Sequence, residues 1–79
     1  MRPSAPKVNR IRATAVWFSD EMMHVRLGDE RIISVPIAWF PRLKSASSEQ
    51  RERWRMIGGG VGIRWPDLDE DVPVATLLK

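Results

Sequence analysis

An alternating segment near the middle of the chain does most to limit the fold. From Met23 to Leu27 every second residue is apolar and the residues between are polar, which predicts a strand with one buried face. A tight connection follows at residues 28–30, and residues 31–35 return to β-branched side chains. Residues 22–35 are therefore predicted to form a β-hairpin.

The segments around this hairpin are predicted to be short elements. Residues 10–18 are rich in Ile, Thr, Val and aromatic residues, which suits a first strand. Pro36 ends the sheet because it has no N–H to donate to a ladder. Pro41 suits the first turn of a helix, so a short helix is predicted over residues 39–46.

A second helix is predicted to begin at Ser47 or Ser48. Ser47 and Gln50 have the spacing of a capping box. Trp54 and Ile57 would face inward, and the glycines at 58–60 would end this helix.

The last part of the chain is predicted to hold one strand and one helix. Residues 61–65 suit a short fourth strand, and Asp71 stands where it would cap a final helix over residues 73–78. The fold class is therefore α+β, with a small antiparallel sheet of three to four strands and two or three short helices packed on one side. Residues 1–9 are expected to be a flexible arm before a single domain at residues 10–79.

Composition narrows the class of protein. The chain has 79 residues, enough for one domain, and no cysteine, which removes disulfides, thiolate metal sites and cysteine nucleophiles. No apolar run approaches the length of about 20 residues that spans a bilayer, and the first residues lack the apolar core of a secretion signal. We expect a cytoplasmic protein with no membrane association.

Four acids cluster near the end of the chain, at Asp67, Asp69, Glu70 and Asp71. They imitate the start of a calcium loop, but Val72 replaces the required glycine and Leu78 replaces the bidentate glutamate. No metal site is therefore expected. Two interpretations remain open: a docking surface for a basic partner, or a solvated loop whose acids pair with nearby arginines, namely Arg42, Arg51, Arg53 or Arg55.

The sequence shows no catalytic arrangement. His24 is the only histidine and is expected on the outer face of a strand. The sequence offers neither a second histidine nor a recognisable nucleophile that could form a catalytic pair with it. The glycines at 58–60 are followed by Val61, not by the Gly-Lys-Ser/Thr of a phosphate-binding loop. We therefore expect no cofactor and no enzymatic activity.

Aromatic pairs and the charge distribution keep nucleic-acid binding as an alternative. Trp17-Phe18 and Trp39-Phe40 are either core residues or stacking platforms for single strands, with one member of the first pair exposed. The net charge is +3, and basic residues stand unopposed near the N-terminus. The residues that would contact nucleic acid are Arg2, Lys7, Arg10, Arg12, Arg51, Arg53 and Arg55.

Two sequence blocks carry a family resemblance, WFPRL at residues 39–43 and WPDLDED at residues 65–71. Together with the Val-Pro pair at 35–36, the Gln-Arg pair at 50–51, Trp54, Gly60 and the Gly-Ile pair at 62–63, they make the chain resemble the bacterial family known as domain of unknown function 2442. The resemblance covers nearly the whole chain.

That resemblance implies a small α+β protein without established catalytic residues. Members of the family are often encoded beside another small protein, an arrangement that suggests a toxin–antitoxin-like pair. The family commonly has histidine at the position of Arg64, so any chemistry of that histidine would be missing here.

Our leading hypothesis from the sequence is a non-enzymatic interaction module, the antitoxin-like or regulatory member of a small protein pair. The sequence leaves the oligomeric state open. The expected partner-binding residues are Asp67, Asp69, Glu70, Asp71, Trp39 and Arg42.

Overall fold

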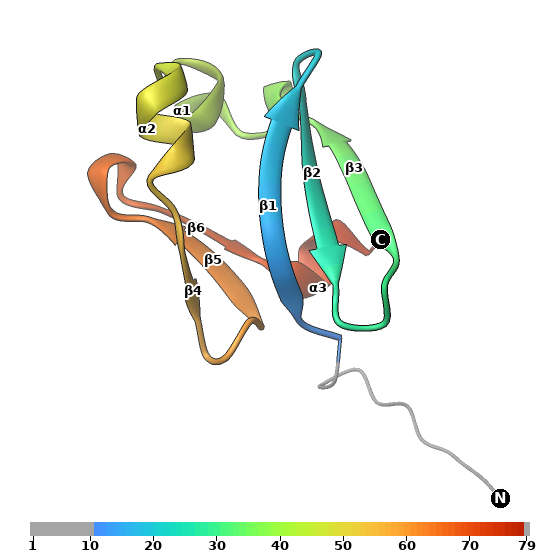
Figure 1. Ribbon diagram of the computed structural model, residues 1–79. Helices are drawn as coiled ribbons and strands as arrows, with labels where there is room; N and C mark the ends of the chain where they lie inside the picture. The colour runs from blue at the N-terminus through green and yellow to red at the C-terminus, as the bar shows by residue number, and fades with distance from the viewer. Residues whose placement is uncertain (1–10, 79) are drawn as a thin grey trace, which may run out of the picture.

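The computed structural model describes residues 11–78, which form two three-stranded antiparallel sheets joined by short helical segments (Figure 1). The first sheet has the order β1-β2-β3 and comprises β1 (Ala13–Ser19), β2 (Met22–Leu27) and β3 (Ile32–Pro36). The second has the order β4-β5-β6 and comprises β4 (Arg55–Ile57), β5 (Gly62–Trp65) and β6 (Glu70–Pro73).

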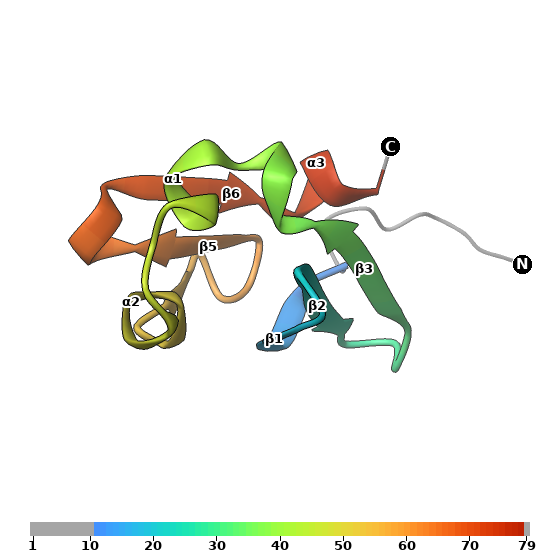
Figure 2. The same ribbon diagram turned by 90° about the horizontal axis from the view of Figure 1, so that it is seen from above.

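Short helices connect and follow the strands. Between the sheets lie η2 (Ile37–Trp39), α1 (Pro41–Lys44) and α2 (Ser48–Glu52); η3 (Pro66–Leu68) joins β5 to β6, and α3 (Val74–Leu77) follows β6. Viewed from above, the two sheets are set at an angle to each other (Figure 2). The expected arm at residues 1–9 lies outside the described residues.

The core contains only apolar side chains among the residues described. The strands β1, β2 and β3 contribute one side of the core, and β5, β6, α1 and α3 contribute the other. The fully buried residues of largest volume are Trp65, Met23, Leu27, Leu43, Ile63, Val25, Val72 and Val74.

The predicted hairpin at residues 22–35 is confirmed. Val25 pairs with Ile33 and Met23 with Val35, and these side chains face the core, as the alternation requires. The loop of three residues ends at Glu30 with a φ of 77°, a left-handed position typical of three-residue hairpin loops. Within this loop, a hydrogen bond from the Arg31 backbone N–H lowers the pKa of Asp29 below its ordinary value, and the Arg31 side chain adds to this effect.

The α+β class with antiparallel pairing is confirmed, but the strands divide between two sheets instead of one. The predicted fourth strand exists as β5, and it pairs with β4 on one side and β6 on the other. The segments β4 and β6 have three and four residues, too short to show a period-two pattern in the sequence.

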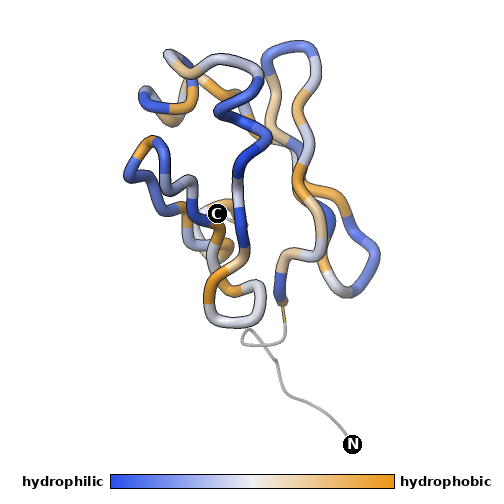
Figure 3. Tube along the Cα trace, turned by 60° about the vertical axis from the view of Figure 1, so that its left-hand side comes forward, coloured by the Kyte–Doolittle hydropathy of each residue, from blue (hydrophilic) through white to orange (hydrophobic). Residues whose placement is uncertain are grey.

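The second helix begins as predicted and ends earlier than predicted. Ser47 caps α2, and the reciprocal bonds with Gln50 form the capping box. The helix stops at Glu52, however, and a hydrophilic run leads from it into β4 (Figure 3). Trp54 is half-buried against the core, whereas Ile57 is exposed, so the prediction that both face inward was wrong for Ile57.

Two further predictions about helix ends were wrong. The glycines at 58–60 do not end a helix; all three have positive φ and form the turn between β4 and β5. Asp71 does not cap the final helix, because it lies in β6 opposite Arg64, and the residue at the N-cap of α3 is Pro73.

Replacing Ser47 by alanine is expected to destabilise the domain by about 0.5–2 kcal/mol. The side chain of Ser47 accepts a hydrogen bond from the Gln50 N–H at 3.1 Å, and alanine would leave that donor without its cap. Urea unfolding followed by circular dichroism measures the change. Ser48→Ala is the matched control, since it alters a neighbouring exposed serine without touching the box; equal losses for both variants would contradict the capping role.

Candidate interaction surface

The acidic cluster lies at one corner of the molecule, which we call the acidic corner and define as residues 64–71. There β5 ends at Trp65, η3 makes the turn, and β6 begins at Glu70 after Asp69 in the left-handed region. The Trp65 side chain fixes this corner to the core. It is fully buried, its indole N–H donates to the Arg51 carbonyl at 3.0 Å, and its ring meets Phe18 edge-on at 6.4 Å.

Arg64 neutralises two of the acids across the β5–β6 hairpin. Its guanidinium donates to the Asp71 carboxylate at 2.6 Å and to the Asp69 carboxylate at 3.1 Å. These bonds, Asp71 first, raise the pKa of Arg64 above its ordinary value. Arg64 therefore has a structural role, as the link between the two strands.

Arg42 and Arg53 engage the remaining acids. Arg53 donates to the Asp67 carboxylate at 3.0 Å. Arg42 donates to the backbone carbonyls of Leu68 and Asp69, and the carboxylates of Asp69 and Glu70 lie 3.9 Å from its guanidinium.

Every acid of the corner thus has an arginine within 4 Å, as the interpretation of a solvated, paired loop predicts. Arg42 and Arg53 pair as that interpretation expects. Arg51 does not pair with an acid, since it donates to the carbonyls of Leu43 and Lys44. Arg64 was missed, because its facing position to Asp71 becomes visible only once residues 70–73 are known to be a strand.

A groove opens beside the acidic corner. It has a volume of about 390 Å³ and is lined by Pro41, Arg42, Ser45, Ala46, Gln50 and Leu68. Two of these residues belong to the WFPRL block and Leu68 belongs to the WPDLDED block. The two blocks, far apart in sequence, therefore build one hollow, which we call the corner groove.

A second, smaller hollow lies between the β1–β2 turn and α2. Its volume is about 160 Å³, and acidic side chains and Arg51 surround it beside Phe18 and Ile37. Arg51 is already bound to two carbonyls there and lies 6.0 Å from the Phe18 ring. The corner groove is the roomier site and the one that both sequence blocks share.

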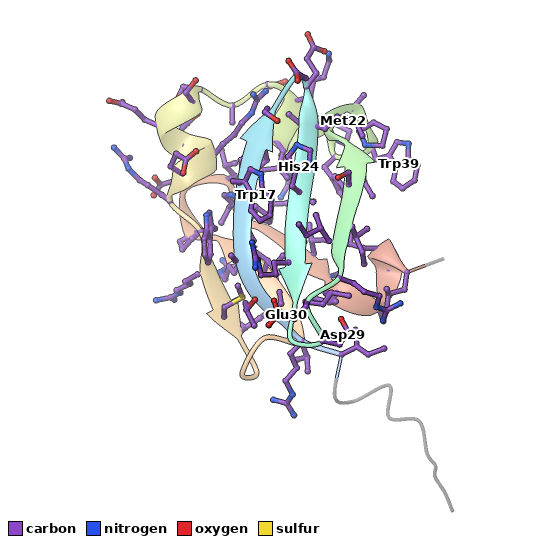
Figure 4. The ribbon with its side chains drawn as sticks, turned by 45° about the vertical axis from the view of Figure 1, so that its right-hand side comes forward. Trp17, Met22, His24, Asp29, Glu30 and Trp39 are labelled. Atoms are coloured by element: carbon purple, nitrogen blue, oxygen red, sulfur yellow. The ribbon has the colours of Figure 1, made fainter. Side chains whose placement is uncertain are left out.

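Trp39 is separated from the rest of the predicted partner-binding set. Its side chain is 60% exposed, and it lies near Met22 beside the end of the first sheet (Figure 4). In both ribbon views α1 lies between η2, which carries Trp39, and the β5–β6 turn (Figures 1 and 2). The structure thus groups Arg42 with the four acids, and places Trp39 elsewhere.

The outer face of the first sheet carries His24 and Trp17. The two rings stack with centroids 5.5 Å apart (Figure 4), and Arg26 lies 6.0 Å from the Trp17 ring. The two ring nitrogens of His24 hydrogen-bond to the hydroxyls of Ser19 at 2.8 Å and Ser34 at 2.7 Å. Trp17 is therefore the member of the first aromatic pair on the outer face, where it is half-buried, while Phe18, also half-buried, packs against the core.

This histidine lies on an open face, and neither of the two hollows includes it. Throughout residues 11–78, no polar or charged side chain is buried. Of the two serines beside His24, Ser19 lines the smaller hollow and Ser34 lines neither hollow.

Of the residues expected to contact nucleic acid, four lie in the described part of the chain, namely Arg12, Arg51, Arg53 and Arg55. Arg2, Lys7 and Arg10 lie outside the described residues. Arg12 reaches the carbonyls of Gly58 and Gly59, both at 3.4 Å; Arg51 and Arg53 bind the groups named above; and Arg55 is exposed on β4.

The balance of charge differs between the described residues and the rest of the chain. Residues 11–78 hold nine basic and ten acidic side chains, a net charge of −1. The positive excess of the chain therefore resides in residues 1–10 and Lys79. Within residues 11–78, no helix is both long and apolar enough to cross a bilayer.

Comparisons with known proteins give the fold and the family. No curated protein matches the chain. A crystal structure of a protein of unknown function from Rhodospirillum rubrum is similar, with a TM-score of 0.75 and 24% sequence identity over 86% of this chain and 84% of that one. A family profile matches residues 13–79. The chain therefore belongs to the family described as protein of unknown function DUF2442.

Proposed function

We propose that this protein is a non-enzymatic interaction module that binds a small protein partner through the corner groove. The observation that carries this proposal is that the two sequence blocks of the family resemblance, distant in the chain, line the same hollow. Ligand sites are concave and mostly apolar with a few polar groups at defined places. Pro41, Ala46 and Leu68 supply the apolar lining, and Arg42 supplies the charged group.

The acidic corner supports this role by holding the groove in shape. The Arg42 side chain is held by hydrogen bonds to the carbonyls of Leu68 and Asp69. The start of η3 is anchored by the buried side chain of Trp65, the residue that precedes it. A preformed site loses less conformational entropy on binding than a flexible one. In this proposal the acids of the corner position Arg42 and do not themselves form the main contact with a basic partner.

The chemistry of the lining defines the occupant. Arg42 is the only charged residue among the six that line the groove, and its guanidinium is partly exposed. The partner would insert one apolar side chain and place a carboxylate or carbonyl oxygen beside Arg42, because a guanidinium is a strong donor to such groups. The product of the adjacent reading frame, which the family resemblance suggests as the other member of a pair, is the partner to test.

A binding role also agrees with the distribution of ionisable groups. Catalytic acids and bases are commonly buried groups with strongly shifted pKa values. Among residues 11–78 all buried side chains are apolar, and the shifted pKa values belong to ion-paired groups, the exposed Asp29 and the half-buried Arg64. Both features support an interaction module over an enzyme.

Titration calorimetry with the purified product of the adjacent reading frame tests this function. The wild-type chain is expected to bind it, and Ala46→Arg is expected to weaken binding by about tenfold or more by filling the groove. Thr76→Arg, which adds the same side chain at an exposed position of α3, should bind as the wild type does. No binding by the wild type, or equal binding by Ala46→Arg, would overturn the proposal.

A further inference from the structure

Strand β3 forms one edge of the first sheet, and the hydrogen bonds of the hairpin show which of its backbone groups face outward. The Leu27 N–H donates to the Arg31 carbonyl and the Ile37 N–H to the Glu21 carbonyl, at the two ends of the β2–β3 ladder. Hydrogen-bonded pairs alternate along an antiparallel ladder, so Ile33 and Val35 direct their backbone groups to β2. The backbone groups of Ile32, Ser34 and Pro36 consequently face away from β2.

This edge lacks the features that usually prevent pairing. Exposed edge strands are normally protected by charged side chains, bulges or covering segments, yet the sequence of β3, IISVP, contains no charge. The edge strands of the second sheet do carry charges, Arg55 on β4 and Glu70 with Asp71 on β6. At the other edge of the first sheet, the N–H of Ala13 at the start of β1 is already bound to the Gly60 carbonyl.

The two most exposed large apolar residues in the described part of the chain stand at the two ends of this edge. Ile32, at the start of β3, is 50% exposed, and Trp39, just beyond its end, is 60% exposed. Figure 4 shows Trp39 near Met22, whose register partner on β3 is Pro36. An antiparallel partner strand of the same sequence would bring each end of the edge against the opposite end of the other.

We propose that two copies of this chain pair through their β3 edges, antiparallel and about a two-fold axis at Ser34, to make a continuous six-stranded sheet. An isologous contact of this kind presents the same patch from both copies. Each Ile32 then lies beside Pro36 and Trp39 of the second copy, which buries the exposed apolar ends.

The hydrogen bonds of this pairing can be counted in the register centred on Ser34. The two Ser34 residues exchange both of their N–H to carbonyl bonds. Each Ile32 N–H donates to the Pro36 carbonyl of the second copy, and the missing N–H of Pro36 leaves only the Ile32 carbonyl without a donor. The proline at the end of the strand is thus compatible with pairing in this register.

Sedimentation equilibrium of the full chain gives the first test. The chain mass is 9.1 kDa, and the wild type is expected to sediment with twice that mass in a concentration-dependent equilibrium. Ile32→Glu is expected to sediment as a monomer, because pairing of the two copies would bury the new carboxylate. The fold of the monomer should tolerate this glutamate, since its partner across the β2–β3 ladder is Arg26. Val61→Glu, at a residue 42% exposed in the turn between β4 and β5, should remain a dimer.

Disulfide trapping tests the register without relying on a destabilised interface. The Cα atoms of a hydrogen-bonded antiparallel pair lie about 5.5 Å apart, within the range that a disulfide spans. The chain has no cysteine, so Ser34→Cys, oxidised by dioxygen with copper phenanthroline, is expected to form a covalent dimer rapidly. Ser19→Cys, the other serine bonded to His24, lies on β1 and should cross-link slowly.

Three results would overturn the pairing: a wild type that stays monomeric into the millimolar range, an Ile32→Glu variant that remains dimeric, or equal cross-linking of the two cysteine variants. None of them bears on the corner groove, whose lining includes no residue of β3. Conversely, Ala46→Arg should leave the dimer intact.

Discussion

Replacing Trp65 by alanine is expected to remove a large share of the free energy of unfolding of the domain. The side chain is fully buried, and truncation of a buried tryptophan typically costs about 3–5 kcal/mol. A domain of this size has a total stability of the same order, at about 0.05–0.15 kcal/mol per residue. The substitution also leaves the Arg51 carbonyl without the indole donor that lies 3.0 Å away.

The matched control for this variant is Trp39→Ala, which removes the same side chain from a site that is 60% exposed. Trp39→Ala should keep the far-ultraviolet circular dichroism spectrum of the wild type and lose little monomer stability in urea. A Trp65→Ala protein that unfolds at the same urea concentration as the wild type would contradict the role of Trp65 as the anchor of the acidic corner.

Gly60→Ala is the second substitution from which we expect a large effect. Gly60 has a φ of +110°, where a Cβ atom causes strain of about 1–3 kcal/mol. A Cβ atom there would also come 2.7 Å from the Ala13 carbonyl oxygen and 2.9 Å from the Arg12 Cβ. Since Gly60 accepts a hydrogen bond from the Ala13 N–H at 2.8 Å, relief of this clash would separate β1 from the β4–β5 turn.

The expected loss for Gly60→Ala is therefore more than about 2 kcal/mol, read as a lower midpoint of urea unfolding. Gly28→Ala is the control, because the nearest atom to its added Cβ is 3.9 Å away and its φ is not in the left-handed region. A small loss for Gly60→Ala, similar to that of Gly28→Ala, would show that the link between the two sheets at this glycine does not limit stability.

The sequence predicted those elements whose signals are local. The β2–β3 hairpin follows from alternation alone, and the capping box at Ser47 follows from residue types three positions apart. The family resemblance also agrees with the fold and the match to residues 13–79. These features depend on few contacts between distant parts of the chain.

The division into two sheets could not be predicted, because it depends on pairing between distant short segments. β4 and β6 become strands only by bonding to β5, and neither segment is long enough to show a period. The glycines at 58–60 favour a helix end and a strand turn equally well, since both need positive φ. The tertiary pairing decides between them.

The candidate site was predicted only in part, because it too depends on contacts between distant segments. The four acids and Arg42 do lie together, and pairing of acids with Arg42 and Arg53 is confirmed. The role of Arg64 depends on the β5–β6 hairpin. The distance of Trp39 from the acids depends on α1, which lies between η2 and the β5–β6 turn. The corner groove itself is formed by residues within 41–50 together with Leu68, which is distant in sequence, and no local pattern reveals such a hollow.

Amide chemical-shift mapping tests the proposed function most directly. The nitrogen-15-labelled chain would be titrated with the unlabelled product of the adjacent reading frame, and shifts would be followed at each assigned amide. We predict that the largest changes fall on residues 42–46, Gln50 and Leu68, which surround the corner groove. Shifts concentrated on any other surface, or no shifts at saturating partner, would contradict the assignment of this groove as the binding site.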